Sequence, residues 1–267
     1  MTGRSAHSNY FLTAWTLCQR ELVRFYRQRS RMIGVIGSPL IFWFLIGSGL
    51  SGSFRHPSTT GGMSYLEYFF PGTMVLIILF TSIFSTISII EDRREGFLQS
   101  VIIAPVARGS IALGKILGGT FLALVQAVIL LLLTPFIGIT MDISSILISG
   151  AVLFLISFGL TGLGFLIAWK MESTQGFHAI MNLFLIPLWL LSGALFPASG
   201  AASWLGNVMA FNPLTYGIDA LRYSFYMNSS GGAALEPTFV ISLLATFAFA
   251  VATFLISALV VRYSKVY

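Results

Sequence analysis

The chain has 267 residues, of which 56% are hydrophobic and only 9% are charged. A water-soluble domain carries roughly 25% charged residues, so this composition excludes a soluble globular enzyme and indicates a protein that is mostly embedded in a membrane. The formal net charge is +6, but the Lys and Arg residues lie between apolar runs instead of forming one basic face, which argues against nucleic acid as a partner.

The first predicted element is an amphipathic helix over residues 9–31. Its apolar positions recur at spacings of 4, 3, 4 and 3, and arginines follow the same rhythm about half a turn away. The apolar positions are Phe11, Trp15, Cys18, Leu22 and Phe25, and the arginines are Arg20, Arg24, Arg27 and Arg31. We expect this helix to lie in the cytoplasmic membrane interface, with its arginines toward headgroups and water. The alternative is a solvated helix that docks on another domain.

Six apolar stretches are long enough to cross a bilayer core of ~30 Å, which takes about 20 helical residues. They are predicted at Met32–Leu50, Phe70–Ile90, Ile111–Gly138, Ile143–Trp169, Ala179–Leu195 and Thr238–Val261. Pro39, Pro135 and Pro187 lie inside these stretches and are expected to kink their helices. The predicted fold class is therefore all-α, with residues 1–267 forming a single polytopic transmembrane domain of six helices.

Basic residues are distributed unequally between the two sides of this topology. Thirteen of the 15 Lys and Arg residues fall on one side, and only Arg55 and Arg222 fall on the other. Cytoplasmic loops carry the excess of Lys and Arg, so both termini are predicted to be cytoplasmic.

The segment 198–237 is too polar and too often interrupted by Gly and Pro to span a membrane, and the topology places it outside. Asn212 and Pro213 are typical of a helix start, with Asn as the N-cap and Pro at the first helical position. An apolar stripe follows at Leu214, Ile218, Leu221 and Phe225. We predict one or two short re-entrant helices that dip into the outer face of the bundle before the last span.

The stretch Gly109–Lys115 resembles a phosphate-binding loop as far as its lysine, but Ile116 stands where Ser or Thr should hold magnesium. It also leads straight into a predicted span, whereas a phosphate loop follows a buried strand. We therefore expect Lys115 to snorkel to the membrane interface, while Gly114 and Gly118 allow close helix packing.

Ionisable residues are nearly excluded from the predicted spans, because all nine acidic residues lie at or beyond a span boundary. A transporter driven by an ion gradient usually needs such groups within the membrane. The three histidines and the single cysteine show neither metal-ligand spacing nor a nucleophile–base pair. We predict no catalytic residue, no metal site and no cofactor in this chain, and we expect the energy for any transport to come from a partner.

Residues 91–105 combine charges of both signs with apolar side chains, directly after the second predicted span. Five successive charged residues precede Phe97, Leu98, Val101 and Ile102, and Pro105 ends the segment. A loop that only orients the protein would not need these apolar residues. The mixture is typical of a short helix that docks in a groove of a soluble partner, with its charges steering the encounter.

From this segment onward the sequence resembles the ABC-2 family of ATP-binding-cassette exporter permeases. The motifs that carry the resemblance are Glu95–Leu98, Ala104–Arg108, Leu113–Lys115, Asn212–Tyr216 and Asp219–Arg222. The order and spacing of these motifs agree with the family, as do the six spans, the interfacial helix and the external segment. Two positions depart from the pattern, because Gln99 stands where the family often has Glu and Ala107 where it often has Ser.

The resemblance implies a half-transporter. Two permease copies, expected as a homodimer surrounded by membrane lipid, would form the pathway, and two separate ABC ATPase (nucleotide-binding) subunits would bind beneath them. These partners would use ATP and magnesium, so no hydrolysis is expected in this chain. The implied location is the bacterial cytoplasmic (inner) membrane.

The resemblance also implies roles for particular residues. Residues 91–105 would be the coupling helix that receives the ATPase motion, through Glu91, Asp92, Arg93, Arg94, Glu95, Gly96, Phe97, Leu98 and Gln99. A second, smaller cytoplasmic contact would involve Lys170, Glu172 and Gln175. The external re-entrant segment would carry the family residues Asn212, Pro213, Tyr216, Asp219 and Arg222.

The amino-acid sequence around Ala104–Lys115 resembles that of multidrug, antibiotic-resistance and nodulation-factor exporters more than that of polysaccharide permeases. We therefore expect efflux of a hydrophobic, amphipathic or lipid-linked substrate. Export of a polysaccharide or lipid-linked glycan is the first alternative, since aromatic side chains also stack on sugars. An alternative of another class is a membrane scaffold that docks a cytosolic partner without moving cargo.

Overall fold

The structure is a computed structural model that describes residues 10–27, 65–196, 202–227 and 236–264, together with isolated positions between 37 and 49. Every regular element in these ranges is a helix. In chain order they are α1 (Tyr10–Tyr26), α3 (Tyr65–Ser85), α4 (Ile87–Arg94), α5 (Phe97–Ile103), α6 (Arg108–Leu131), the 3-10 helix η1 (Thr134–Ile137), α7 (Ile143–Lys170), α8 (Thr174–Leu190), α9 (Ser203–Phe211), α10 (Pro213–Tyr226) and α11 (Glu236–Tyr263). The predicted first span, Met32–Leu50, lies outside the described ranges except for those isolated positions.

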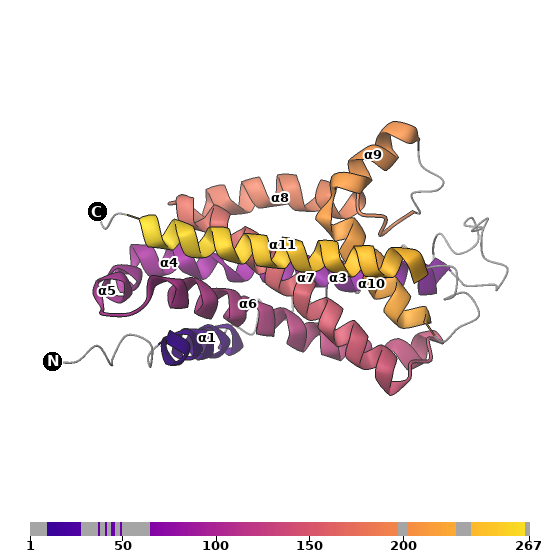
Figure 1. Cartoon of the computed structure of the whole chain (residues 1–267), viewed down its shortest axis with the longest axis horizontal. Coiled ribbons are helices and arrows are strands. Elements are labelled where there is room, and N and C mark those ends of the chain that lie inside the picture. Colours follow the sequence, from indigo (N-terminus) through magenta and orange to yellow (C-terminus); the bar gives the residue numbers. More distant parts are fainter. Residues whose placement is uncertain are drawn as a thin grey trace.

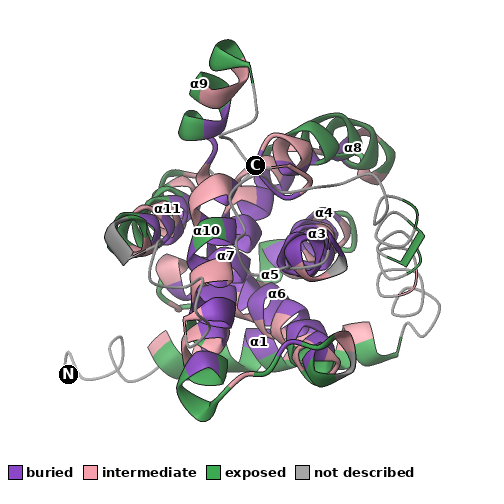
Figure 2. Cartoon of the chain, turned by 90° about the vertical axis from the view of Figure 1, so that its right-hand side faces the viewer, coloured by how far each residue is buried: buried purple, intermediate pink, exposed green. Residues whose placement is uncertain are grey.

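The α3–α4 pair forms the centre of the bundle. Only Thr86 separates the two helices, and its hydroxyl donates to the Ile83 carbonyl at 2.6 Å. Together they make the apolar stretch Glu67–Arg94. In its most apolar 18-residue segment 83% is buried inside the protein, whereas in the corresponding segment of α11 only 22% is buried. Helices α6, α7, α8 and α10 surround the pair, and α11 lies outside, against α6, α7 and α10 (Figures 1 and 2).

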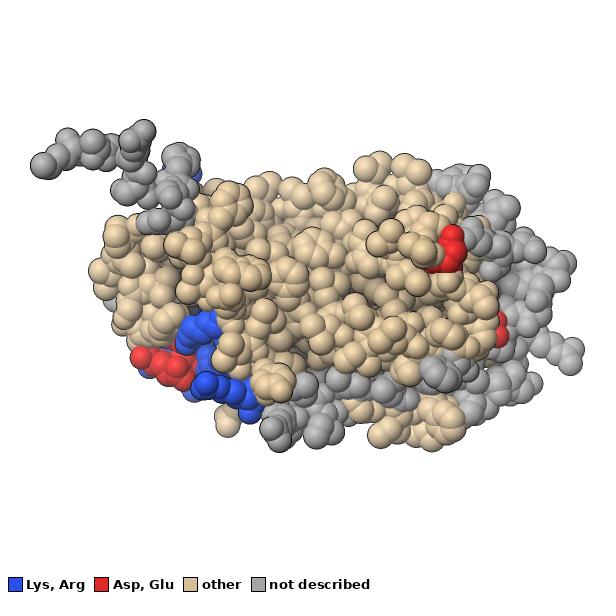
Figure 3. Space-filling view, turned by 90° about the horizontal axis from the view of Figure 1, so that it is seen from below, with Lys and Arg blue, Asp and Glu red and all other residues tan. Residues whose placement is uncertain are grey.

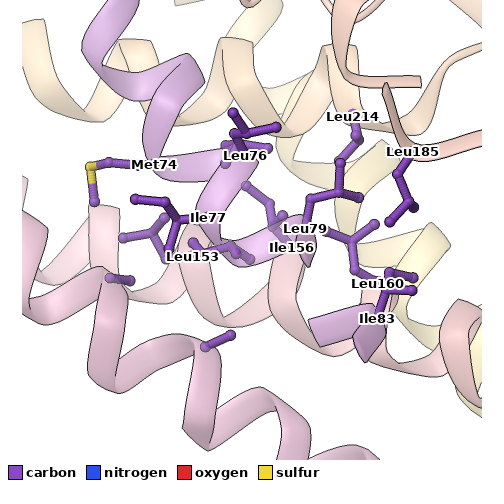
Figure 4. Close-up of a cluster of buried hydrophobic side chains, with 14 of the residues drawn as sticks. Met74, Leu76, Ile77, Leu79, Ile83, Leu153, Ile156, Leu160, Leu185 and Leu214 are labelled. Atoms are coloured by element: carbon purple, nitrogen blue, oxygen red, sulfur yellow. The ribbon is translucent and has the colours of Figure 1, made fainter. Parts of the chain in front are cut away.

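The core lies where α3 meets α7, α8 and α10. Figure 4 shows leucine and isoleucine side chains from all four helices pointing toward one another, among them Ile77, Leu160, Leu185 and Leu214, none more than 2% exposed. In a lipid environment, burying such side chains against protein gains little hydrophobic free energy, because the lipid tails are equally apolar. Close shape matching and small residues at the helix contacts must therefore hold the bundle together.

Four helical stretches are long and apolar enough to cross a membrane: Glu67–Arg94, Arg108–Leu131, Ile143–Lys170 and Thr238–Tyr263. They confirm the predicted second, third, fourth and sixth spans, with shifted ends. The counterpart of the fifth span is α8, which has 17 residues with Pro187 inside and is not among these four. The predicted kink at Pro135 is wrong, since α6 ends at Leu131 and Pro135 opens η1 beyond it.

The predicted helices of the segment 198–237 are confirmed as α9 and α10. The Asn212 side chain accepts a hydrogen bond from the backbone N–H of Leu214 at 3.0 Å, and Pro213 occupies the first turn. Leu214, Ile218, Leu221 and Phe225 are all at most 2% exposed. This stripe faces inward because α10 packs against α7 and α11.

Helix α1 lies across the bundle rather than along it, and in Figure 1 it is seen nearly end-on beside α6. Two glycines of α6 permit the contact, as predicted. A Cβ atom added at Gly114 would lie 2.6 Å from the Ala14 carbonyl oxygen, and one at Gly118 would lie 2.7 Å from the Glu21 Cβ. The face of α1 that packs on α6 therefore consists of Ala14, Leu17, Cys18 and Glu21, all buried.

The α1–α6 contact predicts low reactivity for Cys18, which is fully buried. Burial, and then the charge of Glu21, raise the pKa of this thiol to about 11. At pH 8 only ~0.1% of it is thiolate, the reactive form. In native protein, maleimide labelling of Cys18 should be slow and should accelerate toward pH 11. Gly118→Leu should separate α1 from α6 and raise the rate at pH 8, and rapid labelling of the wild-type protein would contradict the packing described.

Candidate functional site

One end of the bundle carries almost all of the described basic residues. Nine of the ten described Lys and Arg residues gather where α1, α5, the start of α6 and the ends of α4, α7 and α11 meet, and only Arg222 lies at the opposite end. Figure 3 shows these side chains at one end of the face it draws, with mostly tan surface between the two ends. We call this the charged end. The nine are Arg20, Arg24, Arg27, Arg93, Arg94, Arg108, Lys115, Lys170 and Arg262.

A buried ion cluster lies inside the charged end. Asp92 at the end of α4 is fully buried, and Lys115 of α6 is 4% exposed. The Lys115 ammonium donates to Asp92 and to Glu21 of α1, the latter at 2.5 Å, and lies 3.3 Å from the Ser88 hydroxyl. The prediction that Lys115 snorkels to the membrane interface is therefore wrong, because two buried carboxylates hold it inside.

Two arginines of α1 complete the cluster. Arg20 donates to both carboxylate oxygens of Asp92, at 2.8 and 2.7 Å, and this acceptor raises the pKa of the guanidinium. Arg24 donates to Asp92 at 3.0 Å and to Glu91 at 2.6 Å. The expectation that these arginines face headgroups and water is wrong, since they turn toward α4. The exposed face of α1 is instead apolar and includes Phe11, Leu12, Trp15, Val23 and Tyr26.

The cluster has three cations, Arg20, Arg24 and Lys115, and three anions, Glu21, Glu91 and Asp92, so their formal charges cancel. The exposed Glu95 lies 3.7 Å from Arg24 at the rim of the cluster. Removing one ion from water costs several kcal/mol, and only close pairing with good hydrogen bonds offsets that cost. Asp92 satisfies this condition with donors from three side chains, Arg20, Arg24 and Lys115. Because these donors come from α1 and α6, the cluster fixes both helices to the end of α4.

The short helix α5 projects from the same end. Gly96 joins it to α4 with φ of +76°, a left-handed conformation in which only glycine is unstrained. Leu98 is buried and Phe97 half-buried, so this side of α5 faces the bundle. The Arg20 guanidinium carbon lies 3.7 Å from the centroid of the Phe97 ring. One arginine thus contacts α5 and the buried cluster together.

The predicted coupling residues divide between the interior and the surface. Glu91 and Asp92 belong to the ion cluster, and Arg93 donates to the carbonyls of Trp169 and Met171. The exposed residues at this place are Arg94, Glu95, Gln99, Ser100 and Ile103. Within residues 91–105, Glu91–Arg94 forms the last turn of α4, and Gly96 separates it from the short helix α5.

The predicted second contact lies beside the first. Arg94 Nε donates to the carbonyl of Glu172 at 3.0 Å, which joins the end of α4 to the connection between α7 and α8. Lys170, Glu172 and Gln175 are all exposed there. The structure therefore brings together, on one surface, two segments that are about 75 residues apart in the sequence.

The predicted residues of the segment 198–237 lie at the opposite end. Arg222 donates to the Gly193 carbonyl at 2.7 Å, and its guanidinium carbon lies 4.0 Å from the centroid of the Tyr68 ring. Tyr216 donates to the Ala210 carbonyl at 2.8 Å, and the Asp219 carboxylate lies 4.0 Å from Arg222. These contacts hold α10 against its neighbours. No group of His, Cys, Asp and Glu that could hold a metal occurs in the described part of the chain.

Sequence reasoning did not identify Glu21, Arg20, Arg24 or Lys115 as members of one site. The usable signal was the small-residue spacing on two helices, Ala14 with Cys18 and Gly114 with Gly118. Pairing these two faces places Glu21 one turn beyond Leu17, against α6 and within reach of Lys115. The apolar periodicity of α1 instead includes Phe11 and Trp15, which the structure leaves exposed.

The cluster predicts a large stability cost for Lys115→Met. This change leaves Glu21 and Asp92 buried without their shared cation, and breaking such a group costs roughly 3–5 kcal/mol. Thermal unfolding of the purified protein in mild detergent should show a clearly lower Tm. Lys170→Met, the same substitution at an exposed lysine of the charged end, should change Tm little. Adding Glu21→Gln to Lys115→Met should recover part of the loss, and equal Tm values for the two lysine variants would refute the cluster.

Comparisons with known proteins identify the family. The family model described as ABC-2 type transporter matches residues 13–226. The transport permease named ycf38 of Cyanophora paradoxa is 30% identical over 219 residues, which cover 81% of this chain and 74% of that protein. Nodulation protein J of Sinorhizobium fredii is 24% identical over 209 residues, 78% of each chain. The protein named as the multidrug ABC transporter permease YbhR of Escherichia coli is 23% identical over 175 residues, 63% of this chain and 46% of that protein.

ABC-2 permeases in general work with ABC ATPase partners, and the matched region includes most of α1, the ion cluster, α5 and α10. The four long apolar helices agree with a protein that crosses the membrane several times. The chain therefore belongs to the ABC-2 type transporter family and is a transport permease subunit.

Proposed function

We propose that this chain is the membrane subunit of an exporter driven by a separate ATPase, and that α5 is the segment on which the ATPase acts. The observation that carries the proposal is the double contact of Arg20. This residue packs on Phe97 of α5 and binds Asp92 of the buried cluster. A displacement of α5 would thereby reach α1, α4 and α6 together.

The exposed surface around α5 supports docking of a soluble partner. Ile103 is 73% exposed and lies beside the polar residues Gln99 and Ser100 on α5. Arg94 and Glu95 add charges of opposite sign at one edge. An apolar centre with a polar, charged rim is typical of protein–protein interfaces, in which rim charges steer the encounter. The exposed residues 170, 172 and 175 would extend the contact.

The excess of Lys and Arg supports a cytoplasmic location for the charged end under the positive-inside rule. On that orientation both ends of the chain are cytoplasmic, α9 and α10 lie outside, and the ATPase binds where α5 projects. A second copy of this chain would complete the pathway in the bacterial inner membrane. The exposed apolar residues of α11, such as Leu244, Phe247 and Leu255, suit either lipid or that second copy.

The cargo is proposed to be hydrophobic, amphipathic or lipid-linked, moved out of the cytoplasm. Two relatives support this class through their names, one as a multidrug permease and one as a nodulation protein. Apart from Glu67, the charged residues of the described spans lie near the charged end, and the ion cluster neutralises the buried ones, Asp92 and Lys115. A mainly apolar pathway fits such a substrate better than a small hydrophilic ion.

Charge reversal at the α5 surface should uncouple transport from ATP hydrolysis. We expect Arg94→Glu and Glu95→Lys each to lower ATP-dependent export several-fold in vesicles that contain the permease and its ATPase, because rim charges orient the partner. Membrane insertion and yield should stay normal. Arg262→Glu is the matched control, since it reverses an exposed arginine of the same end outside the proposed contact. Unchanged export and stimulated hydrolysis in both variants would show that the partner binds elsewhere, and an absence of any flux in wild-type vesicles would favour a scaffold.

The bend at Gly96 should be needed for coupling. A Cβ atom at this position would meet no other atom within 4 Å, so a substitution acts only through the left-handed backbone conformation. Gly96→Ala should cost about 1–2 kcal/mol at this position and reduce export, because it disfavours the direction in which α5 projects. Gly96→Asn should retain more export, because Asn adopts this conformation more readily. Equal export by the two variants would exclude the bend as a functional element.

A further inference from the structure

A cavity of about 400 Å³ lies between the last turn of α1 and the middle of α6. Its wall includes Phe25, Tyr26 and Arg27 from α1 and Leu122, Gln126 and Ile129 from α6. The two helices touch closely at Gly114 and Gly118 and diverge beyond them, which opens a wedge. From Leu122 to Ile129 the wall on α6 is two turns, or about 10 Å, long.

The cavity opens on an apolar surface. Val125 of α6 and Val23 of α1 line the cavity, Val128 and Leu132 lie outside its wall on α6, and all four are more than half exposed. In a protein whose α6 is long and apolar enough to cross a membrane, such a surface faces hydrocarbon. The molecule most available to this cavity is therefore a membrane lipid, and the elongated wall of the cavity along α6 suits an acyl chain.

Gln126 gives the inner wall an unsatisfied polar group. Its side chain is 3% exposed, and the Thr81 hydroxyl donates to its Oε1 at 2.5 Å. Its Nε2 has no hydrogen-bond partner. Turning the amide over would only exchange the two atoms, so one of them stays unpartnered in either orientation. A buried amide without a partner is costly. This nitrogen has almost no accessible surface, so a molecule in the cavity meets the apolar part of the Gln126 side chain.

Arg27 supplies a positive charge to the wall. It is exposed, and unlike Arg20 and Arg24 it has no ion-pair partner among the described residues. A cation beside an apolar cavity at the charged end is suited to the phosphate of a lipid. The acyl chain of that lipid would enter the cavity while its headgroup stays at the interface.

We propose that this cavity binds one anionic phospholipid of the surrounding membrane. The phosphate pairs with Arg27, and an acyl chain lies along Leu122, Val125 and Ile129. The bound lipid fills the wedge between α1 and α6 and supports the position that the ion cluster gives to α1. This inference does not depend on the cargo, on the direction of transport or on an ATPase.

The test compares two tryptophan substitutions on α6. Val125 lines the cavity and is 59% exposed, whereas Val128 is 52% exposed and is not part of its wall. The whole chain is placed in phosphatidylcholine nanodiscs that contain a small fraction of phosphatidylglycerol, extracted in mild detergent and examined by native mass spectrometry. Wild type and Val128→Trp should retain one phosphatidylglycerol, and Val125→Trp should lower its retention about tenfold by filling the cavity.

Two further variants test the polar groups of the wall. Arg27→Gln should abolish the preference for phosphatidylglycerol over phosphatidylcholine, since that preference rests on the phosphate–arginine pair. Gln126→Leu should leave the retention of both lipids unchanged without lowering Tm, because it removes a buried, unsatisfied amide that the lipid does not contact. Millimolar inorganic phosphate should not displace the retained lipid.

Three results would overturn the proposal. Equal retention by Val125→Trp and Val128→Trp would show that the lipid binds elsewhere. Equal retention of the two lipids by the wild type would remove the role of Arg27. Displacement by inorganic phosphate would indicate an ion site instead of a lipid site. None of these measurements involves ATP hydrolysis or export, so their failure is distinguishable from failure of the proposed coupling.

Discussion

Asp92 and Lys115 meet where water is excluded, and much of the charged end is arranged by the need to neutralise them. Neither charge could remain there alone, because the cost of removing an ion from water is several kcal/mol. Glu21 shares the lysine, and Arg20 and Arg24 supply the remaining donors to Asp92. These partners come from α1, α4 and α6, so the requirement for charge balance also determines where three helices meet.

The position of α1 follows from this requirement. Its charged face must turn inward to reach Asp92, and its apolar residues consequently face outward, including Phe11 and Trp15. A helix on a water-soluble protein has the opposite arrangement. An outward apolar face is favourable beside lipid or against another apolar surface, and α1 lies across the bundle (Figure 1). The wedge between α1 and α6 is a further result of this crossing.

The same end of the molecule joins the interior to the surface. Arg20 contacts Phe97 on one side and Asp92 on the other, and Arg94 reaches the carbonyl of Glu172. A partner that moves α5 therefore acts on side chains that are already linked to the bundle. The opposite end is held differently, by Arg222 and Asn212 bonding to backbone carbonyls near the end of α8.

The sequence by itself determined the helical class, four of the long apolar helices and the cap of α10, because apolar run length and N-cap chemistry act within a few turns of chain. It also indicated the family, through motifs that are short and local. It determined neither the partners of Lys115 nor the inward turn of Arg20 and Arg24. Those depend on Glu21 and Asp92, which are more than 70 residues apart and become neighbours only when α1 crosses α6. Long-range pairing of charges is a property of the packed bundle, so the tertiary structure alone decided the ion cluster and the cavity beside it.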